Sequence, residues 1–308
     1  MDIVALFCDL DNYVKQFSQC SQQKRPALHF ATHARHNRRR RHHCRPNRKA
    51  SLSTSEVMTI LILFHVSNHR TFKHFYLSHV RPNMRGEFPK LVSYNRFIEL
   101  IPNALVALIG FLQTRKGDCS GINFIDSTSL RVCHNFRIHN HRVMAGLAQR
   151  GKTSTGWFFG FKLHLVTNDK GELLEVCITP GNVDDRVPVD TLTKKLWGKL
   201  FGDRGYISGP LFERLFGRGL QLITRIKNNM KNRLMPLFDK LLLRKRGIIE
   251  SIIDQLKNIS QIEHSRHRGV PQYFADILAG LIAYTYREKL PSLNLAPRQQ
   301  RLLEGYAV

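Results

Sequence analysis

Two hydrophobic patterns divide the chain near residue 120. Upstream, the apolar run from Val57 to Phe64 follows Ser53 and Glu56, whose spacing is that of a capping box. This pattern predicts a buried helix that begins close to Ser53. The stretch SYNRFIELIPNALVALIGFLQ predicts a further helical segment.

Downstream, from about residue 121, apolar and polar side chains alternate with the period of a strand. NFIDSTSL is a short strand pattern, and GWFFGFKLHLVTN places every second residue from Phe159 to Leu165 on one apolar face. ELLEVCITPGN follows after the turn NDKG. These three segments predict an antiparallel meander. Lys162 and His164 share the other face of the middle strand, where we expect them to be exposed.

The rest of the chain alternates helix and strand patterns. It predicts a helix over Val187 to Leu196, a strand in KLFGDRGY, a helix over Pro210 to Phe216, a strand in LQLITRI and a last helix around Glu250. Together with the meander, this order indicates an α/β fold with a mixed sheet flanked by helices. One apolar stripe of the last helix is expected to dock on the sheet; it consists of Ile248, Ile249, Ile252, Ile253, Leu256 and Ile259.

The charge of the chain points to a polyanionic partner. Its 308 residues include 48 Lys and Arg against 23 Asp and Glu, a formal net charge of +25, which favours nucleic acid as the partner. No run of about 18 apolar residues is present, so we expect no membrane partner. The N-terminus lacks a basic signal region, which predicts a cytoplasmic location. Six cysteines without a C-x-x-C pair argue against a disulfide framework and a zinc ribbon.

Residues 1–50 are predicted to form a basic, partly disordered arm. Residues 24–49 contain ten Lys or Arg and five His, and no acid lies between Asp11 and Glu56. Such a segment is expected to gain order on a phosphate backbone, although a solvated linker has the same composition. The candidate phosphate contacts are Arg38, Arg39, Arg40 and Arg41.

Residues 51–116 are predicted to form an all-helical DNA-binding region. Arg70 and Lys73 follow the turn SNH and lie among aromatic residues, which is compatible with a helix-turn-helix. A helical packing unit with incidental charges fits the same pattern. Further along, Trp157 fits two roles, stacking on an unpaired base and packing in the core.

Two aspartates stand at the ends of predicted strands. Asp126 ends an otherwise apolar strand, and Asp203 ends a second one in LFGD. If these strands pair in parallel, a spacing of about 4.8 Å places both carboxylates side by side at the carboxyl edge of the sheet. Carboxylates this close repel each other unless a cation lies between them, and Mg²⁺ or Mn²⁺ suits their hard oxygens. Either aspartate alone fits a role as a cap or turn former.

Glu250 is a third candidate ligand. On a helix it shares a polar edge with Arg246, Asp254 and Lys257. This edge is either an exposed face with an ordinary Arg-Glu pair, or a site in which Glu250 binds metal while Arg246 and Lys257 contact phosphates.

The ordered motifs FIDSTSLRVCHN, FFGFKLHLV, ITPGN, GDRGY and RGIIESIIDQLK resemble the DDE transposases of bacterial insertion sequences, most closely the nine-eighty-two family. SEVMTILILFH, RTFKHFY and FPKLVSYNRF resemble the N-terminal half of that family. The resemblance implies a ribonuclease H-like catalytic domain over residues 117–290 and a C-terminal tail over 291–308. It makes Asp126, Asp203 and Glu250 the catalytic residues and the ligands of two Mg²⁺ or Mn²⁺ ions.

The last motif is also similar to a wider tyrosine, arginine, glutamate, lysine signature of related transposases. Arg246, Glu250 and Lys257 fall at the expected spacings, but Leu243 stands at the tyrosine position. After ITPGN the chain has Asp184-Asp185 where many relatives have a His-Asp pair, and neither aspartate is assigned to the site.

The resemblance implies an enzyme that binds the terminal inverted repeats of an insertion sequence in double-stranded DNA, cuts the element's ends and joins the 3′ hydroxyls to target DNA. Joining two ends implies a homo-oligomer, a dimer at synapsis, on the nucleoid of a bacterial cytoplasm. Two alternatives are a DNA-binding protein without catalysis and a nuclease on the same fold. The three acids favour an enzyme, because carboxylates near phosphate weaken simple binding.

Overall fold

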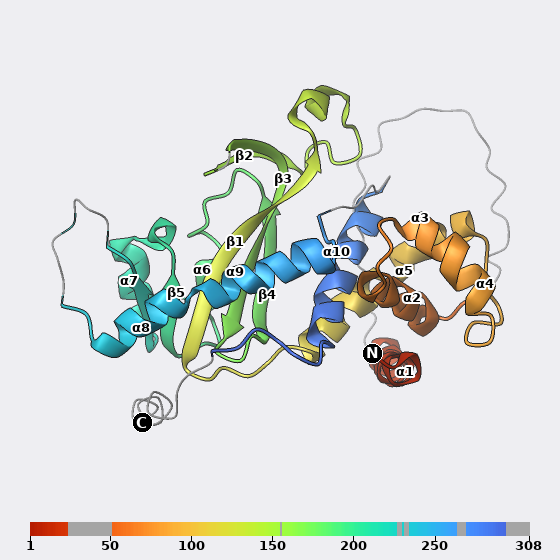
Figure 1. Cartoon of the computed structure of the whole chain (residues 1–308), viewed down its shortest axis with the longest axis horizontal. Coiled ribbons are helices and arrows are strands. Elements are labelled where there is room, and N and C mark those ends of the chain that lie inside the picture. Colours follow the sequence, from red (N-terminus) through yellow and green to blue (C-terminus); the bar gives the residue numbers. More distant parts are fainter. Residues whose placement is uncertain (24–50, 155, 227–229, 231–233, 264–268, 294–308) are drawn as a thin grey trace.

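The structure is a computed structural model of the chain. It describes residues 1–23, 51–154, 156–226, 230, 234–263 and 269–293 (Figure 1). The four arginines predicted to contact phosphate in the basic arm, Arg38, Arg39, Arg40 and Arg41, lie outside the described residues.

A series of helices precedes the sheet in the described part of the chain. They are α1 (Ile3–Gln23), α2 (Thr54–Val66), α3 (Phe72–Phe75), the π-helix η1 (Tyr76–Val80), α4 (Arg81–Asn83) and α5 (Tyr94–Thr114). The predicted capping box is present, because the Ser53 hydroxyl accepts from the N–H of Glu56 at 3.1 Å and the Glu56 carboxylate accepts from the N–H of Ser53 at 2.6 Å. α2 therefore begins where the sequence predicts.

α5 is long and apolar enough, by length and composition alone, to cross a membrane. Its buried side, however, packs on α10 (Val270–Thr285), α2 and α1, whereas Val106 and Ile109 on another side are exposed. A helix with one buried and one exposed side is typical of a helix that packs on a protein core.

Six strands form one curled mixed sheet (Figure 1). They are β1 (Ile122–Cys133), β2 (Gln149–Thr153), β3 (Gly156–Asn168), β4 (Leu173–Pro180), β5 (Gly198–Gly202) and β6 (Leu220–Thr224). The order is β2-β3-β1-β5-β6, and β4 also pairs with β3. β1, β3 and β4 form the predicted antiparallel meander, whereas β5 is parallel to both β1 and β6.

β1 differs from its prediction in length. It continues through Ser127 to Cys133 because β3 goes on pairing with it, so Asp126 lies within the strand rather than at its end. β5, in contrast, ends at Gly202. The sheet edge near Asp126 is therefore produced by the end of β5, and β1 runs on past it.

Helices cover both faces of the sheet. On one face, α6 (Val189–Leu192) and α7 (Gly209–Phe216) pack with Ile125 and Val166; on the other, α8 (Leu237–Lys245), α9 (Gly247–Asp254) and the π-helix η4 (Gln255–Ile259) join the larger core that includes Phe124. Two short 3-10 helices complete the chain, η2 (Asn135–Asn140) and η3 (Arg204–Tyr206).

Three local predictions are wrong. The side chain of His164 is 1% exposed and that of Lys162 is 12% exposed, because β3 lies inside the sheet and the chain after β4 packs over them. The helix predicted over Val187 to Leu196 is helical only from Val189 to Leu192. Ile259 is 53% exposed and leaves the apolar stripe, since the wider π turn of η4 shifts its direction.

A buried ion pair links the helices to the segment after Glu250. His65 on α2 donates from Nδ1 to the carbonyl of Ser260 at 2.5 Å, and its Nε2 lies 3.4 Å from Oδ1 of Asp276 on α10. Burial alone would lower the pKa of His65. The Asp276 carboxylate and the Ser260 carbonyl outweigh that effect and raise the pKa, which favours the imidazolium form.

This pair predicts a pH-dependent stability. Because the folded-state pKa of His65 is raised, its stabilisation is complete below the unfolded-state value of about 6.5 and is lost as pH rises through the folded-state value. Wild type should therefore exceed Asp276→Asn in free energy of unfolding by about 3 kcal/mol at about pH 6, and by less at about pH 9. Urea unfolding at both pH values measures the difference; a difference that does not change with pH would contradict the prediction.

Candidate active site

The parallel pairing of β1 with β5 brings Asp126 and Asp203 to one edge of the sheet. The last matched pair is Phe124 with Phe201, and two more residues in this register set Asp126 level with Asp203. Asp203 keeps an extended backbone, with φ −75° and ψ 170°. Since neighbouring strands lie about 4.8 Å apart, the two carboxylates face a common space.

The Asp126 carboxyl is largely buried, and its surroundings disfavour its charged form. Burial raises its pKa most strongly, and the charge of Asp203 raises it further. The Arg246 guanidinium and a 2.8 Å hydrogen bond from the N–H of Ser127 oppose this rise but do not cancel it. The Asp126 carboxylate is therefore a group that gains from an additional cation.

Arg246 joins Glu250 to Asp126. Its Nη1 lies 3.1 Å from Oδ2 of Asp126, and its Nη2 lies 2.7 Å from Oε1 of Glu250. The side chains of Arg246 and Asp126 are 17% and 21% exposed, whereas that of Glu250 is 61% exposed. The predicted Arg-Glu pair is thus present, and its arginine bridges two of the three candidate acids.

Tyr206 lies beneath the same edge and was not recognised from the sequence. Its ring packs so closely on Gly202 that a Cβ there would lie 3.1 Å from the ring. Its buried hydroxyl lies beside the side chain of Ser127, the residue that follows Asp126. Burial raises the pKa of this hydroxyl well above its usual value, and the Asp126 and Asp185 carboxylates raise it further. Tyr206 therefore stays protonated beside two acids. Its place in the motif GDRGY, three residues after Asp203, is the sequence feature that could have marked it as part of the site.

A second group left out of the predicted site is a buried cluster around Asp185. Lys162 donates to Oδ1 of Asp185 and to the carbonyl of Val183, each at 2.9 Å. His164 Nε2 lies 2.8 Å from the hydroxyl of Thr179, and burial lowers the pKa of His164 to about 4, so the ring is neutral. Period-two alternation puts Lys162 and His164 on one face, but local sequence does not indicate that a loop covers that face.

The two aspartates after ITPGN separate. Asp184 forms an exposed ion pair with Arg186 at 2.6 Å, and this arginine holds the pKa of Asp184 far below its usual range. Asp185 turns inward to Lys162. Only Asp185 therefore belongs to the surroundings of the candidate site.

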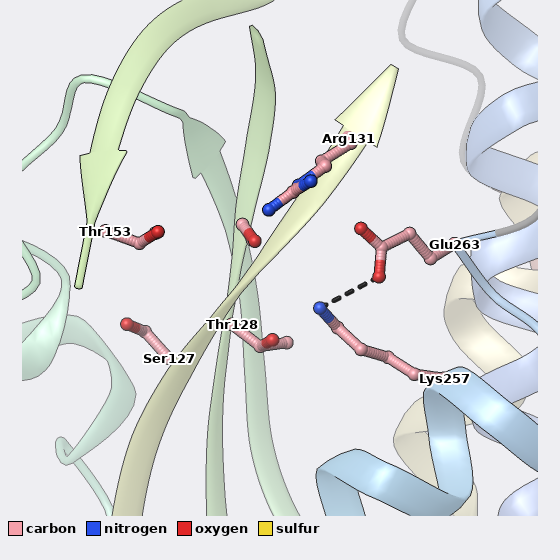
Figure 2. A pocket seen from close by; sticks show the side chains of 7 residues that line it. Ser127, Thr128, Arg131, Thr153, Lys257 and Glu263 are labelled. Carbon is pink, nitrogen blue, oxygen red and sulfur yellow. Dashed lines mark ion pairs between the residues drawn. The ribbon is translucent and has the colours of Figure 1, made fainter. Parts of the chain in front are cut away.

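A cleft of about 670 Å³ follows β1 from Ser127, the residue next to Asp126. It is lined by Ser127, Thr128, Ser129, Arg131, Thr153, Lys257 and Glu263. Figure 2 shows Lys257 and Glu263 facing each other on one side of β1, and the ion pair between them measures 2.9 Å. Lys257, a predicted phosphate contact, is thus at the cleft but already paired.

The two basic residues predicted to bind DNA in the helical region lie elsewhere. Arg70 and Lys73 are exposed at the start of α3, whose N-cap is Thr71. Neither forms an ion pair with a described acid. α3 is only one turn long and runs on into η1 and α4.

Three carboxylates, two of them bonded to Arg246, are donors of the kind that suits a hard divalent cation. Asp126 and Asp203 repel each other, and a guanidinium already bridges Asp126 and Glu250, so positive charge is favoured at this edge. Among the residues that the structure describes, no three His, Cys, Asp or Glu side chains are gathered closely enough to hold one ion together. The ligand type and the negative charge of these residues fit a divalent metal ion, and Arg246 holds two of the acids in place.

Comparison with known proteins identifies the family to which this chain belongs. Residues 116–270 match the family described as "Transposase DDE domain", and this segment makes up half of the chain. The chain belongs to this transposase family. Proteins of this family act in DNA transposition and generally use divalent metal ions.

A solved structure is also similar to the chain. It is described as a cryo-EM structure of the piggyBac transposase synaptic complex with hairpin DNA, is 11% identical and gives a TM-score of 0.44. The match covers 98% of this chain and 77% of that one. Among curated proteins, none matches significantly.

The bridge formed by Arg246 predicts a specific energetic coupling. Replacing Arg246 with Gln leaves the buried Asp126 carboxylate without its cation, which should lower the free energy of unfolding in chelator by about 1–3 kcal/mol. The loss should be smaller when Asp126 is already Asn, because the two residues interact directly.

Urea unfolding of the four proteins in this double-mutant cycle measures the coupling. Arg244→Gln is the matched control, since Arg244 is exposed and has no ion pair with a described acid; it should change stability by less than about 0.5 kcal/mol. Additive effects of the Arg246 and Asp126 substitutions would rule out the bridge.

Proposed function

We propose that the protein is a transposase in which Asp126, Asp203 and Glu250 are the catalytic acids of metal-dependent DNA cleavage and strand transfer. The observation that carries the proposal is the meeting of these acids at one sheet edge. The β1–β5 register aligns Asp126 with Asp203, and Arg246 ties Glu250 to Asp126. All three acids fall within the matched residues 116–270.

We further propose that the sheet is ribonuclease H-like. Its support is the strand order β4-β3-β1-β5-β6, in which an antiparallel meander is extended by two parallel strands, with helices on both faces. Residues 117–290 would form the catalytic domain and residues 51–116 a helical DNA-binding region. α10 packs on α5 and α2, so these two regions share part of one core.

In this proposal Asp126 and Asp203 would hold one Mg²⁺ or Mn²⁺ ion, and Asp126 and Glu250 would hold a second. When bound, such ions make water or a 3′ hydroxyl a better nucleophile and stabilise the leaving oxygen. Tyr206, which stays protonated, supplies a hydroxyl able to donate a hydrogen bond to Asp126. Arg246 keeps Glu250 over the edge of the sheet.

DNA is the proposed substrate and partner. The net charge of +25 supports a polyanionic partner, and a transposase acts on the inverted repeats at the ends of its element. The motif series supports an origin in a bacterial insertion sequence of the nine-eighty-two family and a place on the nucleoid. Because two ends must be joined together, we propose a homodimer at synapsis.

The acids should be essential for cleavage of an element end. Metal ions supply several kcal/mol of transition-state stabilisation, so Asp126→Asn, Asp203→Asn and Glu250→Gln should each slow cleavage by about 100-fold or more. Cleavage of a labelled duplex with Mg²⁺ or Mn²⁺ measures the rate. Asp254→Asn, one turn beyond Glu250 and bonded to Asn258, is the control and should cut normally.

Equal cutting by wild type and the three variants would refute the catalytic assignment. Joining separates a transposase from a nuclease on the same fold. Pre-cut ends with free 3′ hydroxyls should be transferred to a second duplex by wild type; cleavage without any transfer would identify the nuclease.

Metal binding has a readout that does not need activity. Mn²⁺ or Mg²⁺ should raise the melting temperature of wild type, because an ion relieves the repulsion between Asp126 and Asp203. At a concentration 100 times the dissociation constant, the added stability is about 2.7 kcal/mol. Asp126→Asn should lose most of this shift, and chelator should reverse it in wild type. A shift of equal size in Asp126→Asn would place the ion elsewhere.

A further inference from the structure

We propose that β1 and the segment after it form a path for an unpaired DNA strand, which runs from the three acids through the cleft to an aromatic platform at Phe136 and Trp157. This inference rests on the proposed function, because it assigns a course to the substrate of that site. The platform is distinct from the acids, and the two can be tested separately.

All charged side chains between Asp126 and Asp169 are basic. The same stretch exposes five cations without an ion pair to any described acid, namely Arg131, Arg137, Arg142, Arg150 and Lys152. Other arginines are neutralised, as when Arg214 and Arg218 pair with Asp190 at 3.0 and 3.2 Å. A row of unpaired cations is suited to a phosphate backbone.

Two aromatic side chains are exposed at the far end of the row. Phe136 on η2 is 88% exposed, and the ring of His134 lies beside it with centroids 5.1 Å apart. Trp157 at the start of β3 is 49% exposed, and the guanidinium of Arg150 lies 4.8 Å from its ring. The Asn135 side chain donates to the carbonyl of Trp157 at 2.9 Å, which fixes the η2 segment next to β3.

The position of the platform relative to the acids follows from β1. At about 3.3 Å per residue, the seven steps from Asp126 to Cys133 span roughly 23 Å. The cleft lies along this length, lined by hydroxyls of Ser127 and Ser129 and by Arg131. The segment that follows β1 projects beyond the sheet (Figure 1). Hydroxyls and cations suit phosphates, and exposed rings at the end suit bases.

An unpaired strand fits this arrangement better than a duplex. Stacking on a protein ring requires a base whose face is free, and each such contact is sequence-tolerant because every base has a π-face. Cations flanking the ring of Trp157 place phosphate-binding groups next to a stacking surface. This combination is typical of single-strand binding sites.

The test is binding of a single-stranded oligonucleotide that carries 2-aminopurine, by full-length protein in chelator and at elevated salt. Stacking should quench the fluorescence, and salt weakens contacts made by charge alone. Phe136→Ala with Trp157→Ala should weaken binding by about tenfold or more and abolish the quenching, whereas Phe136→Tyr with Trp157→Phe should restore both.

Phe216→Ala is the matched control. Phe216 is also exposed, at 60%, but it stacks on Phe212 at the end of α7, where Arg214 and Arg218 are paired with Asp190. It should bind and quench as wild type does. Circular dichroism of each variant establishes that loss of binding is not loss of fold.

Two outcomes would overturn the proposal. One is that the double alanine variant binds and quenches as wild type does; the other is that Phe216→Ala impairs binding equally. If instead the acid variants cut DNA normally while the platform result stands, the proposed function fails and the strand-binding surface does not.

Discussion

Burial of the Asp126 carboxylate is the constraint to which the surrounding structure responds. Parallel pairing of β1 with β5 also sets this carboxylate level with the exposed Asp203, whose charge adds to the effect of burial. Arg246 brings a positive charge to Asp126, and the neighbouring Tyr206 stays neutral. Lys162 neutralises Asp185 on the same side. Each of these contacts lowers the cost of concentrating negative charge where a phosphodiester and its metal ions would have to approach.

Glu250 depends on contacts far from the sheet edge. It is carried by α9, whose next turns are the π-helix η4 and Ser260. The Ser260 carbonyl accepts a hydrogen bond from His65 on α2, and His65 also contacts Asp276 on α10. The helices of the N-terminal half thus fix the end of the segment that presents the glutamate. The position of Glu250 is therefore held by tertiary contacts and not by the sheet alone.

Local sequence predicts what local physics determines. The Ser53 capping box and the alternation from Phe159 to Leu165 identify α2 and β3 because hydrogen bonds within a turn and side-chain period are local properties. Burial of His164 and the inward turn of Asp185 depend on which loop covers which face, and no window of sequence contains that information. From sequence, the alignment of Asp126 with Asp203 could be proposed only by assuming that two strands about 75 residues apart pair in parallel. The structure contains this pairing, and its register sets the two aspartates level.

The position of α10 has a consequence for how such an enzyme can be altered. This helix follows the three candidate acids in sequence yet buries its apolar side on α5 and α2, so a single core extends from Leu6 to Tyr284. A chimaera that replaced residues 51–116 with a foreign DNA reader would leave that side of α10 uncovered. The region proposed to recognise DNA and the domain proposed to cut it therefore cannot be exchanged as independent modules; a change of target specificity would have to come from surface substitutions that leave their shared interior intact.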